Sequence, residues 1–267
     1  MTARPAKRPV ITLTTDFGSA DLYVSVMKGV ILGICPNAQI VDISHEVPAY
    51  DIARGAFLIA QAWRYFPKGT VHVGVVDPGV GTARRPILVE LGGQRFVGPD
   101  NGLLAMTYSD VDHKARELTN RRYFRSDVSR TFHGRDVFAP VAAHLANGVK
   151  PASFGTEIKD HWKSSLHRPQ RTSKRLWSGT VLTVDRYGNL ITNFPVGEFE
   201  DVRTRPFEMA IGMTRVSRLA LTFADGQPGE IFAIEGSSGL LEIVENQGSA
   251  AKTLGCGVGS PVDLELF

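Results

Sequence analysis

The feature that most constrains the fold is the alternation of apolar strands and helical segments over the first half of the chain. The strand-like runs are short, rich in valine, isoleucine and threonine, and followed by aspartate or turn residues. Strands are expected at residues 10–15, 40–43 and 71–76, helices at 22–34, 52–66 and 137–146, and a hairpin at 87–91 and 95–97. This alternation predicts an α/β fold with a mostly parallel sheet flanked by helices.

The pattern changes in the second half. Residues 159–175 are polar and hold six basic residues, with Asp160 as the only acid. A solvated linker explains this charge better than nucleic-acid binding, because no aromatic stacking pattern accompanies it. Beyond it, short apolar segments without a convincing helix span residues 179–184, 190–193, 207–211, 218–223, 231–234 and 240–244. This spacing predicts a small antiparallel barrel or sandwich. We expect two domains, over residues 1–170 and 171–267.

Composition argues against several classes of protein. The apolar runs are shorter than the roughly 18 residues needed to span a membrane, and no signal-peptide pattern follows the basic N-terminus. We therefore expect a cytoplasmic protein that binds neither membrane nor nucleic acid. Cys35 and Cys256 are far apart and have no CxxC partner, so buried free thiols are expected. Metal-ligand spacings and phosphate-binding glycine motifs are missing, so we expect no metal and no cofactor.

One motif in the first half carries groups that can do chemistry. Asp77 ends the strand at 71–76 and is followed by a Gly-rich turn and Arg84, while His133 lies in a later Phe-His-Gly segment. Asp16 also ends a strand, and ligands of open α/β sheets bind at that edge. Taken alone, Asp77 is typical of a turn. With the other three residues, it indicates a site where an acid, a guanidinium and an imidazole hold and deprotonate a water molecule.

Three loops of the second half contain polar residues that could contact a ligand. They hold Asp185, Tyr187 and Asn189, then Ser237 and Ser238, and finally Gln247. Each loop is also typical of an ordinary turn. None of them identifies a ligand by itself.

The ordered set of motifs resembles the adenosine-forming S-adenosyl-L-methionine (SAM) hydrolases, also called SAM hydroxide adenosyltransferases, which are relatives of the fluorinases and chlorinases. The matching stretches are residues 14–18, 76–82, 98–102, 131–136, 185–193 and 237–239. The resemblance implies an N-terminal α/β domain and a C-terminal small antiparallel β-barrel. It also implies a homotrimer, with each site between the N-terminal domain of one subunit and the C-terminal domain of the next.

The resemblance also implies roles for individual residues. Asp77, Arg84 and His133 look like the water-activating triad, and the halogenases carry tyrosine where Asp77 and His133 stand. The expected substrate contacts are Asp16 to the ribose hydroxyls, Asp185 and Ser237 with Ser238 to the methionine amino and carboxylate groups, and Tyr187, Asn189 and the backbone near Gln247 to the adenine. Ser238 stands where the halogenases have arginine.

The reaction expected from the resemblance is attack of water, activated as hydroxide, on the ribose C5′ of SAM, giving adenosine and L-methionine. Three alternatives remain open. The chain could be a non-catalytic SAM- or adenosine-binding protein, or a halogenase, which Asp77 and His133 disfavour. It could also be a metal-dependent hydrolase with Asp16, Asp77 and His133 as ligands.

Overall fold

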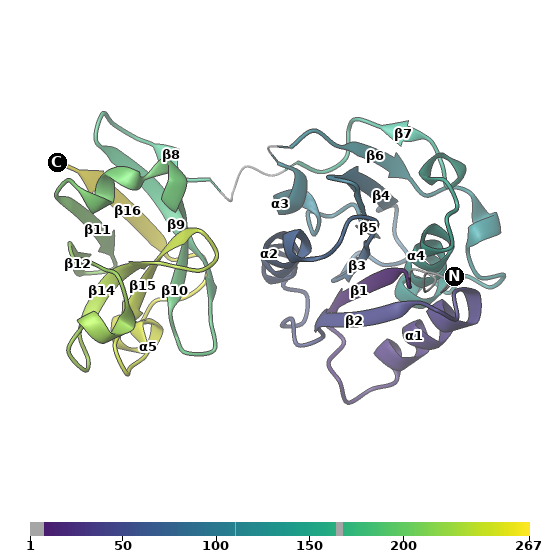
Figure 1. The fold of residues 1–267 in the computed structure, drawn as a ribbon, viewed down its shortest axis with the longest axis horizontal. Helices are drawn as coiled ribbons and strands as arrows, with labels where there is room; N and C mark the ends of the chain where they lie inside the picture. Colours follow the sequence, from purple (N-terminus) through teal and green to yellow (C-terminus); the bar gives the residue numbers. More distant parts are fainter. Residues whose placement is uncertain (1–7, 110, 164–167) are drawn as a thin grey trace, which may run out of the picture. The chain divides into compact units, whose positions relative to one another are not determined.

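The computed structural model describes residues 8–109, 111–163 and 168–267. The chain divides into two compact units, Met1–Ser164 and Ser165–Phe267, which are drawn in Figure 1. Each unit has a sheet and an apolar core of its own.

The first unit is built on a seven-stranded sheet in the order β2-β1-β3-β5-β4-β6-β7. Its strands are β1 (Val10–Thr15), β2 (Gln39–Ser44), β3 (Val71–Val75), β4 (Pro86–Leu91), β5 (Gln94–Pro99), β6 (Lys114–Glu117) and β7 (Glu157–Ile158). The four strands β2, β1, β3 and β5 are parallel, and the remaining pairs are antiparallel. The predicted α/β fold with a mostly parallel sheet is therefore confirmed.

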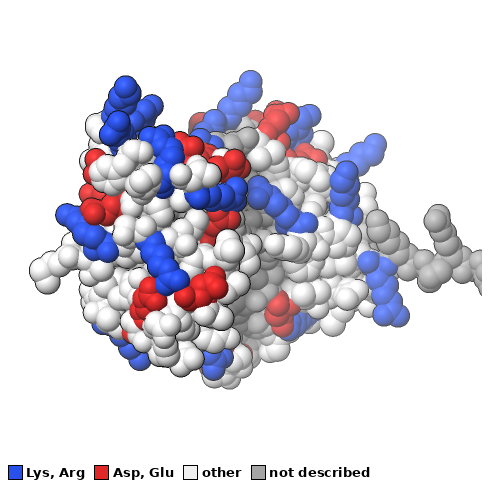
Figure 2. Space-filling model, turned by 60° about the vertical axis from the view of Figure 1, so that its left-hand side comes forward, with Lys and Arg blue, Asp and Glu red and all other residues white. Residues whose placement is uncertain are grey.

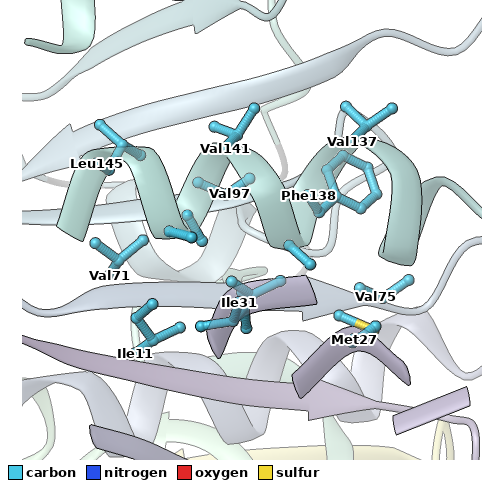
Figure 3. Packing of buried hydrophobic residues seen from close by; sticks show 14 of the residues in the cluster. Ile11, Met27, Ile31, Val71, Val75, Val97, Val137, Phe138, Val141 and Leu145 are labelled. Carbon is cyan, nitrogen blue, oxygen red and sulfur yellow. The ribbon is translucent and has the colours of Figure 1, made fainter. Parts of the chain in front are cut away.

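Helices cover both faces of this sheet, and the side chains of its central strands β1 and β3 are almost all buried. The helices are α1 (Tyr23–Ile34), α2 (Ile52–Ala62), α3 (Ala105–Tyr108) and α4 (Ala139–Ala146). In Figure 3, side chains of α1 and α4 enclose Ile11, Val71 and Val75 of the sheet. On the other face α2 and α3 contribute to a second cluster, which includes Phe96. The buried strands hold the loops at their carboxyl ends on a rigid base.

The helix expected at 137–146 begins earlier, with an irregular turn. Residues Gly134–Phe138 form a π-helical turn that leads directly into α4. Such turns occur frequently at functional sites. This one begins directly after His133, so the imidazole lies where the helix enters the core.

The second unit is a nine-stranded sheet that curls into a half-barrel, and all of its strand pairs are antiparallel except β13–β14. Its strands are β8 (Gln170–Arg171), β9 (Leu176–Val184), β10 (Leu190–Pro195), β11 (Phe207–Ile211), β12 (Thr214–Val216), β13 (Leu219–Ala220), β14 (Ile231–Glu235), β15 (Leu240–Glu245) and β16 (Pro261–Leu266). Strands β12 and β14 lie close together without being paired, which reflects the curl. The predicted barrel-like β architecture is confirmed.

Three details of the second half differ from the sequence expectations. Strand β16 was not predicted, although it lies between β9 and β11. A helix was not expected either, yet α5 (Ala250–Leu254) forms, capped by the Ser249 side chain at its start and by left-handed Gly255 at its end. The segment expected at 218–223 is only the two-residue strand β13 followed by a 3₁₀ turn.

The expected linker at 159–175 is partly ordered structure. The backbone N–H of Trp162 donates to Asp100, and β8 pairs with β9. Residues 164–167 of that linker lie outside the described residues. Both cysteines are free thiols, but only Cys35 is fully buried.

The surface carries charges of both signs. On the face presented in Figure 2, basic and acidic side chains are intermingled. Among the residues that the structure describes, no helix is long and apolar enough to cross a membrane.

Candidate active site

A cavity of about 240 Å³ lies at the carboxyl ends of β1 and β3. It is lined by Asp16, Phe17, Ala49, Tyr50, Val75, Asp77, Val80, Thr131, Phe132, His133 and Gly134. Three of the four candidate residues of the first half, Asp16, Asp77 and His133, therefore face one cavity. Arg84 is not among its lining residues but lies directly behind two of them.

Arg84 joins Asp77 to His133. Its Nε donates to Oδ1 of Asp77 over 2.9 Å, and its Nη2 contacts both Oδ2 of Asp77 and Nδ1 of His133, the latter at 2.9 Å. The side chains of Asp77 and Arg84 are 5% and 9% exposed, so water screens the ion pair little. The guanidinium carbon also lies 5.3 Å from the centre of the Phe138 ring. The three residues predicted to hold water do meet in space.

The turn that carries Asp77 depends on glycine. Gly81 has φ of +77°, and a Cβ atom there would lie 2.2 Å from the carbonyl oxygen of Arg130. Only glycine fits this conformation and close approach without strain. The end of β3 is fixed as well, because Nδ2 of Asn101 donates to the carbonyl oxygen of Val76 over 2.9 Å. These contacts place the Asp77 carboxylate at the cavity wall.

His133 is kept neutral by its surroundings. Burial lowers its pKa, and the positive charge of Arg84 lowers it further, while Asp77 and Asp136 act in the opposite direction. The net result is a pKa below the ordinary histidine value. At neutral pH the imidazole is therefore uncharged.

Asp16 faces the cavity beside Tyr50. Its Oδ2 accepts a hydrogen bond from the backbone N–H of Tyr50 over 2.9 Å. Tyr50 has φ of +68° and is 71% exposed, so the loop presents an aromatic residue at the mouth of the cavity. Sequence reasoning missed Tyr50, because neither the left-handed backbone nor its contact with Asp16 leaves a pattern in the sequence.

In the second unit, Asp185 organises its own loop. Its Oδ1 accepts from the backbone N–H groups of Tyr187 and Asn189, and its Oδ2 accepts from Nδ2 of Asn189, each at 2.9 Å. Tyr187 is 76% exposed, whereas Asn189 is buried. The expected adenine contacts thus lie on one turn, with the aromatic ring open to solvent. Gln247 lies on an exposed left-handed turn after β15. That turn leads into Ser249 and α5, which pack against Gly188 of the Asp185 loop, and the backbone N–H of Ala251 donates to the Gly188 carbonyl oxygen.

A buried glutamate near this turn was missed by sequence reasoning. Glu242 of β15 is 8% exposed, and its carboxylate lies beneath Gly236 in the loop that also contains Ser237 and Ser238. Burial, followed by the charge of Asp185, raises the pKa of Glu242 to about 7. The Ser238 hydroxyl lies beside it and lowers the pKa, although Oγ makes no hydrogen bond of good geometry in the described chain. The only sign of Glu242 in the sequence is a charged residue inside an otherwise apolar strand.

Comparison with known proteins assigns this geometry to a family. The SAM hydroxide adenosyltransferase N-terminal domain matches residues 11–155, and the C-terminal domain of the same family matches residues 179–263. The chain belongs to the SAM hydroxide adenosyltransferase family. The resemblance inferred from the sequence motifs is confirmed.

Several relatives of this SAM hydroxide adenosyltransferase family member match nearly its full length. It is 40% identical to the (R)-S-adenosyl-L-methionine hydrolase of Salinispora tropica, over 94% of this chain and 95% of the relative, and 41% identical to that of Thermus thermophilus, over 96% and 99%. A fluorinase from Actinoplanes is 29% identical, over 89% and 91%. An uncharacterized conserved protein from Thermotoga maritima superimposes with a TM-score of 0.88 at 34% identity, over 96% of this chain and 99% of that one.

The cavity of this family member is poorly suited to the metal-dependent alternative. Within the described parts of the chain, no group of three or more His, Cys, Asp or Glu side chains could hold a metal ion. Asp77 and His133 each direct an acceptor atom toward the Arg84 guanidinium. A metal ion on Nδ1 of His133 would have to displace the Arg84 guanidinium, which is already hydrogen-bonded to its single lone pair.

Proposed function

We propose that this protein hydrolyses SAM to adenosine and L-methionine, with water activated as hydroxide attacking the ribose C5′. The observation that carries the proposal is the pair Asp77 and His133 on the cavity wall, joined by Arg84 behind them. Related halogenases have tyrosines at the two wall positions. The printed name of the 40% identical relatives, (R)-S-adenosyl-L-methionine hydrolase, supports the same reaction and adds the (R) configuration at sulfur.

The step that needs catalysis in this reaction is activation of the nucleophile. The leaving group is a neutral thioether, so it needs no general acid. Water is a poor nucleophile and hydroxide is scarce at neutral pH, so the site must take a proton from a bound water molecule. General-base catalysis of this kind typically contributes about 10²–10⁴-fold. Hydroxide attacking a sulfonium compound destroys charge, and a cavity that excludes water strengthens the attraction between the two.

We further propose that the second unit supplies the rest of the substrate site. Glu242 and Asp185 would face the methionine ammonium group, Ser237 and Ser238 its carboxylate, and Tyr187, Asn189 and the backbone near Gln247 the adenine. The sequence resemblance supports a homotrimer in which this unit of one subunit meets the cavity of the next, and a cytoplasmic location. Both remain predictions. Sedimentation of the intact protein at several concentrations tests the trimer.

Product analysis tests the reaction. The purified protein is incubated with each sulfonium epimer of SAM in H₂¹⁸O, and the products are separated by chromatography and weighed by mass spectrometry. We expect equal amounts of methionine and of adenosine that carries ¹⁸O on C5′, formed faster from the (R) epimer. Unchanged SAM would indicate a binding protein, 5′-halo-adenosine formed with added halide would indicate a halogenase, and loss of activity with chelators would indicate a metal enzyme.

Replacing Asp16 by alanine should mainly weaken substrate binding. Asp16 is proposed to hold the ribose hydroxyls, and hydrogen bonds to a charged group contribute about 1.5–3 kcal/mol. We therefore expect KM to rise by roughly 10- to 100-fold, with a smaller fall in kcat caused by the misplaced ribose. Steady-state kinetics and calorimetric titration measure this. Asp21→Ala, at an exposed aspartate nearby in the sequence, is the control. Normal binding by the Asp16 variant would exclude the ribose role.

Glu242 should make the free protein less stable as pH rises. Its pKa is about 7 in the folded protein against an ordinary glutamate value of 4.5, so between these two pH values the folded state binds more protons than the unfolded state. The contribution of Glu242 to stability is therefore greatest below pH 4.5 and falls by roughly 3 kcal/mol between there and about pH 7. In urea denaturation, the free energy of unfolding of Glu242→Gln should lack this pH-dependent part.

Binding of SAM should also affect the ionisation of Glu242. The ammonium group of SAM favours the charged carboxylate, so binding near pH 6.5 should release protons.

A second glutamate provides the control for that measurement. Glu245 lies three residues further along β15 and accepts a hydrogen bond from Thr253 over 2.6 Å. The Glu245→Gln variant should keep the pH dependence of the unmodified protein. Identical pH dependence in Glu242→Gln and the unmodified protein would show that Glu242 ionises normally in its buried position.

A further inference from the structure

The contacts of His133 determine which of its ring nitrogens carries the proton. Nδ1 lies 2.9 Å from Nη2 of Arg84. A guanidinium has five N–H donors and no acceptor, and it stays charged in proteins. Nδ1 must therefore accept this hydrogen bond. Because a neutral imidazole has one N–H group, that proton is on Nε2.

Arg84 is itself held so that it can impose this arrangement. Two of its nitrogens contact the two oxygens of Asp77, which fixes the plane of the guanidinium. Its third nitrogen, Nη1, is buried and has no hydrogen-bond partner among the described residues. Arg84 does not line the cavity, whereas Asp77 and His133 do. A ligand in the cavity therefore meets the carboxylate and the imidazole.

The structure assigns different roles to the three residues, an assignment that rests on the proposed hydrolase function. We propose that Arg84 is a positioning residue that holds His133 as the Nε2–H tautomer, that His133 donates a hydrogen bond to the attacking oxygen, and that Asp77 accepts the proton of the water. The sequence resemblance implies only that the three residues together activate water, whereas this assignment gives each residue a separate role.

The reaction step then balances without further groups. A lone pair of the water oxygen forms the bond to C5′. The C5′–S bond breaks, and its electron pair stays on sulfur as the neutral thioether of methionine. One water proton passes to the Asp77 carboxylate and later to solvent, while the other remains on the 5′-hydroxyl of adenosine. The Nε2–H group of His133 stabilises the negative charge that develops on oxygen before C5′ is reached.

The same geometry opposes His133 as the proton acceptor. Nε2 already carries a proton. Protonation of Nδ1 would point its N–H group at the Nη2–H group of Arg84, so that two donors would oppose each other. Burial and the Arg84 charge lower the pKa of the imidazole, which acts in the same direction. Asp77 keeps lone pairs on both oxygens beyond those used by Arg84, because a carboxylate accepts about four hydrogen bonds.

Nitrogen NMR tests the tautomer without any substrate. The protein is labelled with ¹⁵N-histidine, and long-range ¹H–¹⁵N spectra separate protonated from unprotonated ring nitrogens for the seven histidines. The His133 signals are those lost in His133→Asn. We expect Nε2 protonated and Nδ1 unprotonated at neutral pH. In Arg84→Met, which lacks the donor to Nδ1, the two tautomers should become mixed. An Nδ1–H tautomer in the unmodified protein would overturn the proposal.

Two amide substitutions test the role of the donor. The amide of glutamine reaches the position of Nε2 and can donate there, whereas that of asparagine reaches only Nδ1. Loss of a single preorganised donor lowers kcat by about 10²–10³-fold. We therefore expect kcat of His133→Asn and of His133→Ala to fall by that amount. His133→Gln should stay at least roughly 10-fold more active than either, with KM little changed in all three. His144→Gln, at a half-buried histidine that packs on Tyr123, is the control and should keep full activity.

Failure of this proposal and failure of the proposed function give different results. If His133→Gln is as inactive as His133→Ala while both bind SAM and remain folded, His133 acts as the base and the proposal is wrong. If the unmodified protein turns over no SAM, the hydrolase function is wrong, and the tautomer measured by NMR still decides whether Arg84 controls His133.

Discussion

Replacing Asp77 by alanine should lower kcat by about 10²–10⁴-fold while KM for SAM stays nearly unchanged. The carboxylate faces the cavity and is proposed to accept the proton of the attacking water, so its loss removes an interaction that is made only as the reaction proceeds. Binding should persist because ribose, adenine and methionine are proposed to be held by other residues. Single-turnover kinetics with excess enzyme measures the chemical step directly, and calorimetric titration measures binding.

The alanine variant also leaves Arg84 without its partner. The Arg84 side chain is 9% exposed, and breaking one side of a buried ion pair typically costs about 3–5 kcal/mol. Asp77→Asn is therefore the matched variant, because its amide oxygen still accepts from Arg84 but is a very weak base. We expect Asp77→Asn to be as slow as Asp77→Ala but closer to the unmodified protein in urea denaturation. Full activity of Asp77→Asn would show that Asp77 is not the proton acceptor.

The N-terminal fold could be predicted because its strands are buried on both faces. Strands β1 and β3 are short segments rich in valine, isoleucine and threonine, and Asp16 and Asp77 follow at their carboxyl ends. The carboxyl ends of parallel strands lie at one edge of a sheet, so the sequence already indicated that the two carboxylates share a cavity. The sequence motifs already grouped Arg84 and His133 with these carboxylates, and the contact of Arg84 with His133 bears this out.

Other features could not be predicted because they depend on tertiary contacts. The position of Arg84 along the chain does not say whether its side chain lies in the cavity or behind it. That location decides whether Arg84 contacts the nucleophile or is a positioning residue. The raised pKa of Glu242 arises from burial and from Asp185, which lies on another loop. The π-helical turn after His133 has no sequence pattern of its own. Strand β16, by contrast, has a recognisable sequence pattern, because every second residue (Val262, Leu264 and Leu266) is apolar and buried. It could therefore have been predicted.

Replacing Asp136 by alanine should reduce the free energy of unfolding by about 3 kcal/mol. The Asp136 carboxylate is fully buried in the π-helical turn and accepts from Arg135 over 2.6 and 2.9 Å and from the backbone N–H of Ser129 over 2.9 Å. Arg125 lies 3.3 Å away. The estimate is at the low end for a buried pair because both arginines reach solvent. Urea denaturation measures the change.

The effect of Asp136 should depend on pH in a defined direction. Burial alone would raise its pKa, but hydrogen bonds from Arg135 and Ser129 outweigh burial, so the pKa lies below its ordinary value. A carboxylate with a lowered folded-state pKa stabilises the protein fully above its unfolded-state pKa, and this contribution is lost as pH falls through the folded-state value. The difference between Asp136→Ala and the unmodified protein should therefore be constant near neutrality and shrink in acid.

Asp127 lies in the loop that leads to this turn but is exposed, so Asp127→Ala should leave stability unchanged. Because Asp136 also ties down the backbone that leads to His133, its loss should lower kcat even at low temperature, where the variant remains folded. Equal stability of Asp136→Ala and Asp127→Ala would mean that the buried carboxylate contributes no net stability. A normal kcat in a destabilised Asp136→Ala would mean that packing of Phe132 and Phe138 holds the imidazole in place without it.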